Sequence, residues 1–248
     1  MQLHCEQVGT GGRVLLLLHG MSGNGGVWKP LLEVLRGEWP GKILVPDLRG
    51  HGRSPAGRHY GYGHHAADVA DLIEPDERVT VVAHSMGSAV ALAAASGWYG
   101  ISIEAVLAFG VKVHFSDAEI EKSQSLAKLP VRWFDTRGEA VERFLRLSGL
   151  TGLVSEDAEV VHAGVREEGG RWRVAADPGT FSAVGPKFED IVRAAKIRPR
   201  LACGSEDQMV KVDDLRRIDP GAVELPGLGH NFHVQAPKAL AELMTRLL

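Results

Sequence analysis

Short apolar runs alternate with amphipathic segments through the first half of the chain. Four of the runs contain no regular polar interruption, and they are residues 14–18, 43–45, 79–83 and 105–109. Continuous apolar runs of this length are typical of strands that are buried on both faces of a parallel sheet. Helices are predicted in the intervals, at residues 30–35, 62–73 and 86–96. The repeated order of strand, helix and strand predicts an α/β fold.

The pattern changes after residue 109, where strand-like runs give way to capped helical segments. Ser116 with Glu119, and Thr136 with Glu139, have the spacing of capping boxes at helix starts. A third helix is predicted to begin at Ser155, and a glycine pair at residues 169–170 is expected to end it. Residues 111–195 are therefore predicted to form a mostly helical cap.

Strand-like runs return at residues 200–203 and 222–225. A last helix is predicted over residues 237–248, beginning with a proline in its first turn. We expect residues 1–110 and 196–248 to form one core, because 248 residues suit a single α/β domain with an insertion better than two domains.

Composition narrows the class of protein. The chain has 28 basic and 31 acidic residues, and this balance argues against nucleic acid as a partner. The two cysteines, Cys5 and Cys203, do not form a disulfide framework, which favours a reducing compartment. The first residues lack a signal-peptide pattern and no apolar run is long enough to span a membrane, so we expect a cytoplasmic protein with no membrane contact. Nothing in the pattern indicates an oligomeric state.

Ser85 lies where a buried strand meets an alanine-rich helix. Ala83 and Gly87 flank it at the two positions where a sharp strand-to-helix turn leaves no room for large side chains. Such a turn exposes the serine hydroxyl above the sheet edge, and the backbone N–H groups at the start of the helix favour a developing negative charge. In isolation the motif is equally compatible with a tight structural joint.

Five landmarks in order along the chain resemble the α/β-hydrolase family. They are His19-Gly20, the segment from Pro46 to Ser54, the turn at Ser85, the segment from Gly204 to Asp207, and the segment from Gly227 to His230. The resemblance covers nearly the whole chain. It implies a mostly parallel eight-stranded sheet flanked by helices, with the cap inserted after the sixth strand.

The resemblance also implies a catalytic triad in the order serine, acid, histidine, which assigns Ser85, Asp207 and His230. His230 is expected to take the proton of Ser85, and Asp207 to orient the imidazole. The backbone N–H groups of Met21 and Met86 are the expected oxyanion hole. This chemistry requires no metal and no organic cofactor.

Several other residues compete for these roles. Glu206, Asp213 and Asp214 are alternative acids, and His233 is an alternative base. His84 is expected to pack beneath the turn or to bond to backbone.

Other polar residues are assigned outside the chemistry. His64 and His65 are expected on the surface, and the loop that contains Asp47, Arg49 and His51 is interpreted as structural. Met209, Val210 and Phe232 are candidates to line an apolar acyl pocket next to the acid and base, and each is equally compatible with a place in the core.

These features predict a serine hydrolase that cleaves a small or medium, largely apolar carboxylic ester of a small-molecule substrate through an acyl-serine intermediate. A lactone or a thioester suits the same residues. One alternative is hydrolysis of a carbon–carbon bond in a vinylogous diketone, although His84 stands where enzymes of that type usually have asparagine. Another alternative is a non-catalytic protein that binds a small ligand.

Overall fold

The computed structural model describes residues 1–183 and 185–248, and its centre is a sheet of seven strands within those residues. The spatial order is β1-β3-β2-β4-β5-β8-β9. Their bounds are β1 (Cys5–Val8), β2 (Arg13–Leu18), β3 (Lys42–Pro46), β4 (Arg78–His84), β5 (Ser102–Phe109), β8 (Arg200–Gly204) and β9 (Val223–Leu225). Only β1 runs antiparallel to its neighbour, so the predicted mostly parallel α/β sheet is confirmed.

The strand count differs from the expected eight. The main sheet has seven strands within the described residues, and five of them, β1 to β5, come first along the chain. The long excursion away from the sheet therefore begins after the fifth strand, β5, and not after the sixth.

Successive residues of the central strands face opposite sides of the sheet, which explains why the runs are continuously apolar. In β2, Leu16 and Leu18 belong to one core cluster, whereas Leu15 and Leu17 belong to the other. All four side chains are fully buried. Two hydrophobic layers, one on each face of the sheet, therefore fix the strands that carry the site.

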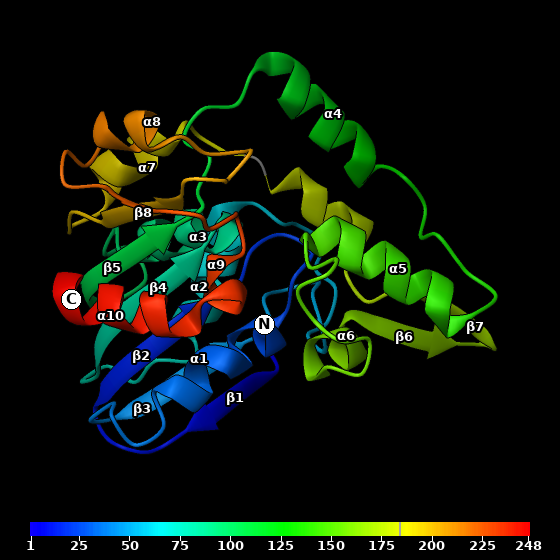
Figure 1. Ribbon diagram of the computed structural model, residues 1–248, viewed down its shortest axis with the longest axis horizontal. Helices are drawn as coiled ribbons and strands as arrows, with labels where there is room; N and C mark the ends of the chain where they lie inside the picture. Colours follow the sequence, from blue (N-terminus) through cyan, green and yellow to red (C-terminus); the bar gives the residue numbers. More distant parts are fainter. Residues whose placement is uncertain (184) are drawn as a thin grey trace.

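Helices cover both faces (Figure 1). The layer that includes Leu16 contains residues of α2 (Tyr62–Ala70), α3 (Met86–Ala94), α7 (Phe188–Ala194) and α8 (Val212–Arg216). The opposite layer contains residues of η1 (Gly25–Trp28), α1 (Lys29–Val34), α9 (Phe232–Gln235) and α10 (Pro237–Leu247). The last helix begins at the predicted proline.

The excursion between β5 and β8 contains further elements besides α7. They are α4 (Asp117–Ala127), α5 (Arg137–Ser148), α6 (Glu159–Gly164), β6 (Val165–Glu168), β7 (Arg171–Val174) and η2 (Pro178–Ser182). Both predicted capping boxes are present, at the starts of α4 and α5. In Figure 1, α4 lies at the top of the molecule and the α5, α6 and β6–β7 group lies to one side of the sheet.

The prediction of one helix from Ser155 to the glycine pair is wrong. The chain forms the short α6 and then an antiparallel hairpin of β6 and β7, in which Gly169 and Gly170 make the turn. Their φ values are 59° and 78°, and a two-residue hairpin turn with positive φ at both positions strongly favours glycine. The pair therefore reverses a hairpin and does not end a helix.

No helix within the described residues is both long and apolar enough to cross a membrane. The two cysteines are unpaired, Cys5 on β1 and Cys203 on β8.

An ion pair in the interior fixes the loop after β3. The guanidinium of Arg49 donates from Nε to Asp68 Oδ2 at 2.6 Å, and the two side chains are 10% and 1% exposed. The other two nitrogens of Arg49 donate to the carbonyl oxygens of His59 and His64, at 2.8 and 2.9 Å. This loop is thereby tied to α2.

Removal of the acid should be costly because Arg49 would remain as a buried charge without its anion. We expect Asp68→Asn to lower the free energy of unfolding by about 3–5 kcal/mol, measured by urea denaturation. Asp71→Asn is the matched control, since that side chain is 70% exposed, and we expect a change within about 0.5 kcal/mol. Equal effects of the two substitutions would contradict this account of the loop.

Candidate active site

Ser85 lies between the end of β4 and the start of α3, in a turn with almost no free space. Its φ and ψ are 49° and −118°, a conformation that L residues rarely adopt. A methyl group at Gly87 would lie 2.6 Å from the carbonyl oxygens of both Leu18 and His19. The helix therefore starts against the end of β2, and only glycine permits this approach.

Two residues other than glycine have positive φ in the part of the chain that the structure describes, and they are Ser22 and Ser85. Ser22 lies in the loop after β2, where Gly23 N–H donates to Gly20 O at 3.1 Å. Each such conformation costs on the order of 1–3 kcal/mol, and strain of this kind concentrates at functional sites. Both strained residues lie within one residue of an expected oxyanion donor, Met21 or Met86.

Neither of these two N–H groups donates to a protein acceptor within residues 1–183 and 185–248. Met21 and Met86 both line the cavity that Ser85 reaches. Met86 is the first residue of α3, so its N–H points out of the helix start. The two donors are thus available to an oxygen of a bound molecule.

His230 and Asp207 are in direct contact. His230 Nδ1 lies 2.8 Å from Asp207 Oδ2, and the carboxylate is fully buried. The other carboxylate oxygen accepts a hydrogen bond from the Met209 N–H at 2.8 Å. Because a carboxylate accepts, Nδ1 is the donor in this contact, and in a neutral ring Nε2 then has a free lone pair.

The alternative residues lie elsewhere. Asp213 and Asp214 pair with Arg216 and Arg217 on the surface, and Glu206 is exposed. His233 is fully buried, with both ring nitrogens lacking a partner among the described residues. It packs on Trp28 at 4.9 Å between ring centres. Of the proposed acids, Asp207 is the one that contacts His230.

Ser85 and His230 both lie near the end of β5. The Ser85 N–H donates to Phe109 O at 2.8 Å, and a methyl group on the next residue, Gly110, would lie 3.3 Å from His230 Cε1. No hydrogen bond joins the Ser85 hydroxyl to His230 among the described residues. Such contacts are often long before a substrate binds.

His84 joins the serine turn to the histidine loop. Its Nε2 donates to the backbone carbonyl of His230 at 3.2 Å, and the two rings are 4.6 Å apart. A hydrogen bond from His84 to backbone is one of the two roles that the sequence predicts for this residue. Burial, with His233 and His230 nearby, lowers the pKa of His84 well below the usual 6.5, so the ring is neutral. His84 therefore positions His230 without carrying charge.

Two buried polar residues hold the loop after β2 in place. The sequence predicts a structural role for Asp47 in its own loop, but it assigns no side-chain role to His19. His19 accepts the Leu48 N–H at Nε2, 2.9 Å away, and donates from Nδ1 to Gly20 O at 2.8 Å. Asp47 accepts the Gly25 N–H at 2.6 Å and the Arg53 N–H at 2.7 Å. The structural role predicted for Asp47 is confirmed, and the sequence does not indicate that this side chain reaches Gly25 beyond the loop after β2.

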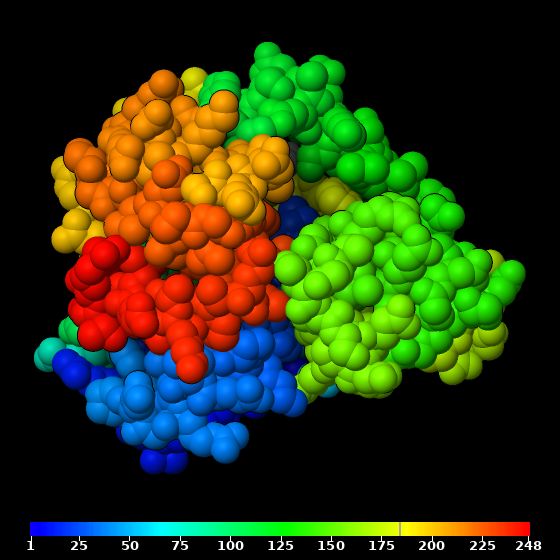
Figure 2. Space-filling view, in the orientation of Figure 1, coloured from blue at the N-terminus to red at the C-terminus, as the bar shows by residue number. Residues whose placement is uncertain are grey.

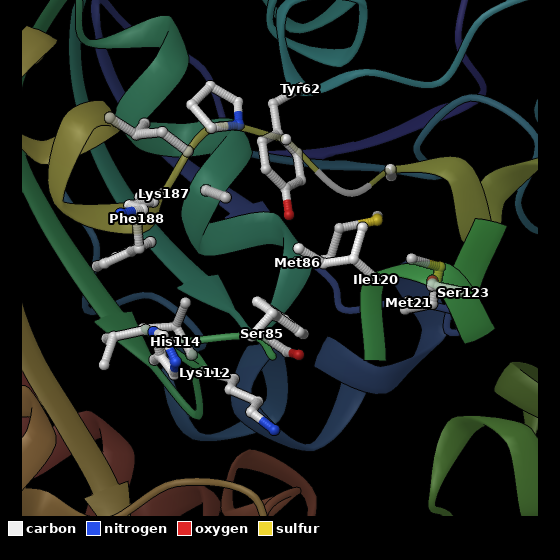
Figure 3. A pocket seen from close by; sticks show the side chains of 18 of the residues that line it. Met21, Tyr62, Ser85, Met86, Lys112, His114, Ile120, Ser123, Lys187 and Phe188 are labelled. Carbon is white, nitrogen blue, oxygen red and sulfur yellow. The ribbon is translucent and has the colours of Figure 1, made fainter. Parts of the chain in front are cut away.

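A cavity of about 500 Å³ opens at Ser85. Figure 3 shows Ser85 and Met86 on one side of it, with Ile120 of α4 and Phe188 of α7 among the other residues that line it. Most of its lining comes from residues 111–123 and 181–191. On the molecular surface, the face in Figure 2 is hollowed between the green residues that include α4 and α5 and the orange residues that follow β8.

Of the three residues expected to line an acyl pocket, the structure places only Met209 at this cavity, and its side chain is 52% exposed. Val210 is 5% exposed in one core layer, and Phe232 is fully buried in the other, 4.5 Å from the ring of Phe109. Proximity in sequence to Asp207 and His230 did not determine direction, because both side chains point into the core.

No group of three or more histidine, cysteine, aspartate or glutamate side chains within residues 1–183 and 185–248 is arranged to hold a metal ion. The expectation that His65 lies on the surface is wrong. Its ring is fully buried and both nitrogens lack partners among the described residues, whereas His64 is exposed.

Buried neutral histidines make the fold sensitive to acid. Burial lowers the pKa of His19 to about 4, that of His51 to about 3 and that of His233 to about 3. In the unfolded chain these rings take up protons below pH about 6.5, whereas the folded protein excludes the protons until much lower pH.

The free energy of unfolding should therefore fall as pH decreases from about 6.5 to about 4, by about 1.4 kcal/mol per pH unit for each such histidine. Urea unfolding across this range measures the slope. His233→Phe should reduce the slope by about 1.4 kcal/mol per pH unit, which corresponds to the uptake of one proton. A slope unchanged by this substitution would show that His233 titrates normally in the folded protein.

Glycine at residue 87 should be essential to the turn. We expect Gly87→Ala to destabilise the protein by about 1–3 kcal/mol, because the added methyl overlaps two carbonyl oxygens. Gly138 is the matched control, since it is also the second residue of a helix and a methyl group there would meet nothing within 4 Å. Gly138→Ala should be neutral or stabilise by up to about 1 kcal/mol. Similar losses for both, measured by urea denaturation, would rule out the steric explanation.

Comparison with known proteins gives partial matches in sequence. The chain is 37% identical over 95 residues to Lipase LipV of Mycobacterium tuberculosis (strain ATCC 25618 / H37Rv), which covers 37% of this chain and 35% of that protein. It is 35% identical over 85 residues to a serine hydrolase-like protein of Danio rerio, which covers 32% of this chain and 26% of that protein. The matched segments thus span about a third or less of these curated relatives.

Solved structures match over nearly the full chain. An E-2-(acetamidomethylene)succinate hydrolase has a TM-score of 0.81 at 19% identity, with 99% of this chain and 94% of that chain covered. A thioesterase domain from the curacin biosynthetic pathway has a TM-score of 0.77 at 20% identity, with 97% and 94% covered. These likenesses establish the fold. The profile described as "Alpha/beta hydrolase family" matches residues 15–243, and the chain therefore belongs to that family.

Proposed function

We propose that the protein is a serine hydrolase that cleaves a small or medium, largely apolar carboxylic ester through an acyl-Ser85 intermediate. The observation that carries the proposal is the 2.8 Å contact between His230 and the buried Asp207, beside a serine held in a strained turn. Serine hydrolysis needs a nucleophile, a base and a group that orients the base. A lactone or thioester is compatible with the same residues.

In the first step the Ser85 hydroxyl oxygen attacks the carbonyl carbon of the ester, and His230 Nε2 takes the hydroxyl proton. Asp207 holds Nδ1–H of the ring, so Nε2 is the nitrogen available as base. The charge that develops on the imidazolium is stabilised by the buried carboxylate. The tetrahedral intermediate then collapses, the proton passes from Nε2 to the leaving oxygen, and the alcohol departs.

The oxygen that becomes negative in this step is expected to face the N–H groups of Met21 and Met86. Both donors are without acceptors among the described residues, and both are held by backbone whose conformation is fixed before substrate arrives. Loss of one such donor typically costs about 2.7–4 kcal/mol of transition-state stabilisation.

Water completes the reaction in the second step. His230 Nε2 removes a proton from water as the water oxygen attacks the acyl carbon, and the collapse returns that proton to the Ser85 oxygen. The carboxylic acid leaves and the enzyme is restored. No step needs a metal or an organic cofactor.

The cavity supports an apolar substrate. Its lining includes Val111, Val113, Ile120, Phe181 and Phe188, and its volume of about 500 Å³ suits a small molecule. Residues 111–195 supply most of that lining. These residues act as a cap that sets specificity, while residues 1–110 and 196–248 supply the chemistry. Similar proteins named as esterase, lipase and thioesterase agree with this reaction class.

A fluorophosphonate probe tests the nucleophile directly. Wild type should be labelled at Ser85 and should hydrolyse p-nitrophenyl esters, and Ser85→Ala should abolish both. Asp207→Asn should lower kcat by about three to four orders of magnitude, because the wrong ring nitrogen then carries the proton. Glu206→Gln is the matched control, since that side chain is exposed beside Asp207, and its kcat should stay within about twofold of wild type.

The outcomes separate the alternatives. Unlabelled wild type would refute a serine nucleophile and favour a ligand-binding protein. Labelling at Ser85 without turnover of esters, a lactone or a thioester would point to carbon–carbon bond hydrolysis, to be assayed with a vinylogous diketone.

A further inference from the structure

Tyr62 presents a hydroxyl group to the catalytic cavity. It is the first residue of α2, its ring lines the cavity, and Figure 3 shows the phenol oxygen directed towards the side where Met86 and Ser85 lie. The hydroxyl makes no hydrogen bond to any residue in the described part of the chain. Burial raises the pKa of Tyr62 to about 12, so the phenol keeps its proton and remains a donor.

The other polar side chains at the cavity are engaged or exposed. Ser123 donates its hydroxyl proton to Phe181 O at 2.7 Å, and Lys112 forms an ion pair with Glu119. The remaining polar residues of the lining, apart from Ser85, are exposed at its rim: His114, Asp117, Lys187 and Glu189. Tyr62 therefore offers the cavity interior a hydrogen-bond donor that no group among the described residues uses.

The ring that carries this donor is held from behind. A methyl group at Gly185 would lie 2.8 Å from Tyr62 Cδ2, so the backbone there packs directly against the ring. Beyond it lies a second hollow of about 680 Å³, which shares Tyr62, Gly185, Pro186 and Ile191 with the catalytic cavity. The ring thus forms part of the wall between the two hollows, and its packing against the backbone fixes the position of its hydroxyl.

Tyr62 is partly buried, and its hydroxyl faces the cavity. A bound substrate that fills the cavity would withdraw this hydroxyl from water, and an unsatisfied buried polar group is unfavourable. A plain alkyl chain in the cavity would leave the phenol hydroxyl without a hydrogen-bond partner. A substrate with an oxygen acceptor at that point would satisfy it, and sites built to bond a polar group discriminate strongly against analogues that lack the group.

We propose that Tyr62 is a specificity-determining residue, which donates a hydrogen bond to a second oxygen acceptor of the substrate, separate from the carbonyl that Ser85 attacks. This inference rests on the proposed function. It narrows the substrate class from plain alkyl esters to esters that carry an oxo, ether or amide oxygen a few bonds from the scissile carbonyl.

Matched ester pairs test the proposal. Each pair consists of a plain ester and an analogue in which a carbonyl group or an ether oxygen replaces one methylene. In one series the replaced position moves stepwise along the acyl chain, and in the other it moves along the alcohol. In wild type, one position should raise kcat/KM of the analogue over the plain ester by about tenfold. Tyr62→Phe should remove that preference, so that kcat/KM of the analogue falls to that of the plain ester measured in the same variant.

Tyr99→Phe is the matched control. It deletes the same hydroxyl from a residue that lines the second hollow but not the catalytic cavity, and it should keep the wild-type preference. If no position in either series gives a preference that depends on Tyr62, the proposal is overturned, although ester turnover itself would still support the proposed function.

A binding measurement tests the role of Tyr62 without any turnover of the ester. Calorimetry measures the affinity of each ester pair for Ser85→Ala and for the double variant Ser85→Ala/Tyr62→Phe, neither of which can cleave the esters. Ser85→Ala should bind the favoured analogue about tenfold more tightly than the plain ester, and the double variant should bind the two esters equally. If each variant binds the analogue and the plain ester with equal affinity, the role of Tyr62 is overturned, even if wild type proves inactive on every ester. Inactivity together with a Tyr62-dependent affinity would refute the proposed reaction alone.

Discussion

The active site depends on the close approach of the α3 start to the end of β2. At Gly87 the backbone of α3 lies so near the carbonyl oxygens of Leu18 and His19 that even a methyl group would overlap them. This contact forces Ser85 into its positive φ, exposes its hydroxyl, and directs the first N–H of the helix towards the cavity. The loop after β2 adopts a matching strained conformation at Ser22. The close approach at Gly87 thus places the candidate nucleophile and one expected oxyanion donor together, and the loop after β2 brings the other donor to the same cavity.

Hydrogen bonds from neutral histidines to backbone groups hold other loops around the candidate site in place. His19 and His84 each link separate loops through backbone hydrogen bonds, and burial keeps both rings uncharged. A neutral imidazole can donate from one nitrogen and accept at the other, so His19 connects two backbone groups with one side chain. Because these buried rings resist protonation, they make the stability of the folded protein sensitive to acid. The cavity wall comes mainly from residues 111–123 and 181–191, which lie outside these loops.

Local rules predicted the elements whose signals are local. Continuous apolar runs predicted β2 and β4 because a strand covered on both faces has no polar side, and the capping boxes at Ser116 and Thr136 are present because they join residues three apart. The same rules failed at Gly169 and Gly170, since a glycine pair ends a helix as readily as it turns a hairpin. They also failed at His65, because an amphipathic pattern does not reveal what packs against a polar position.

The sequence by itself determined the α/β class and the turn at Ser85, because these follow from short-range steric and periodic patterns. The order of the candidate catalytic residues was implied by the resemblance to the α/β-hydrolase family. Only the tertiary structure decided that Asp207, among four nearby acids, contacts His230. It also decided that Val210 and Phe232 point into the core while Tyr62 faces the cavity. These outcomes depend on how segments that are distant in the sequence pack together, and side-chain direction at such contacts is set by the neighbours and not by the local sequence.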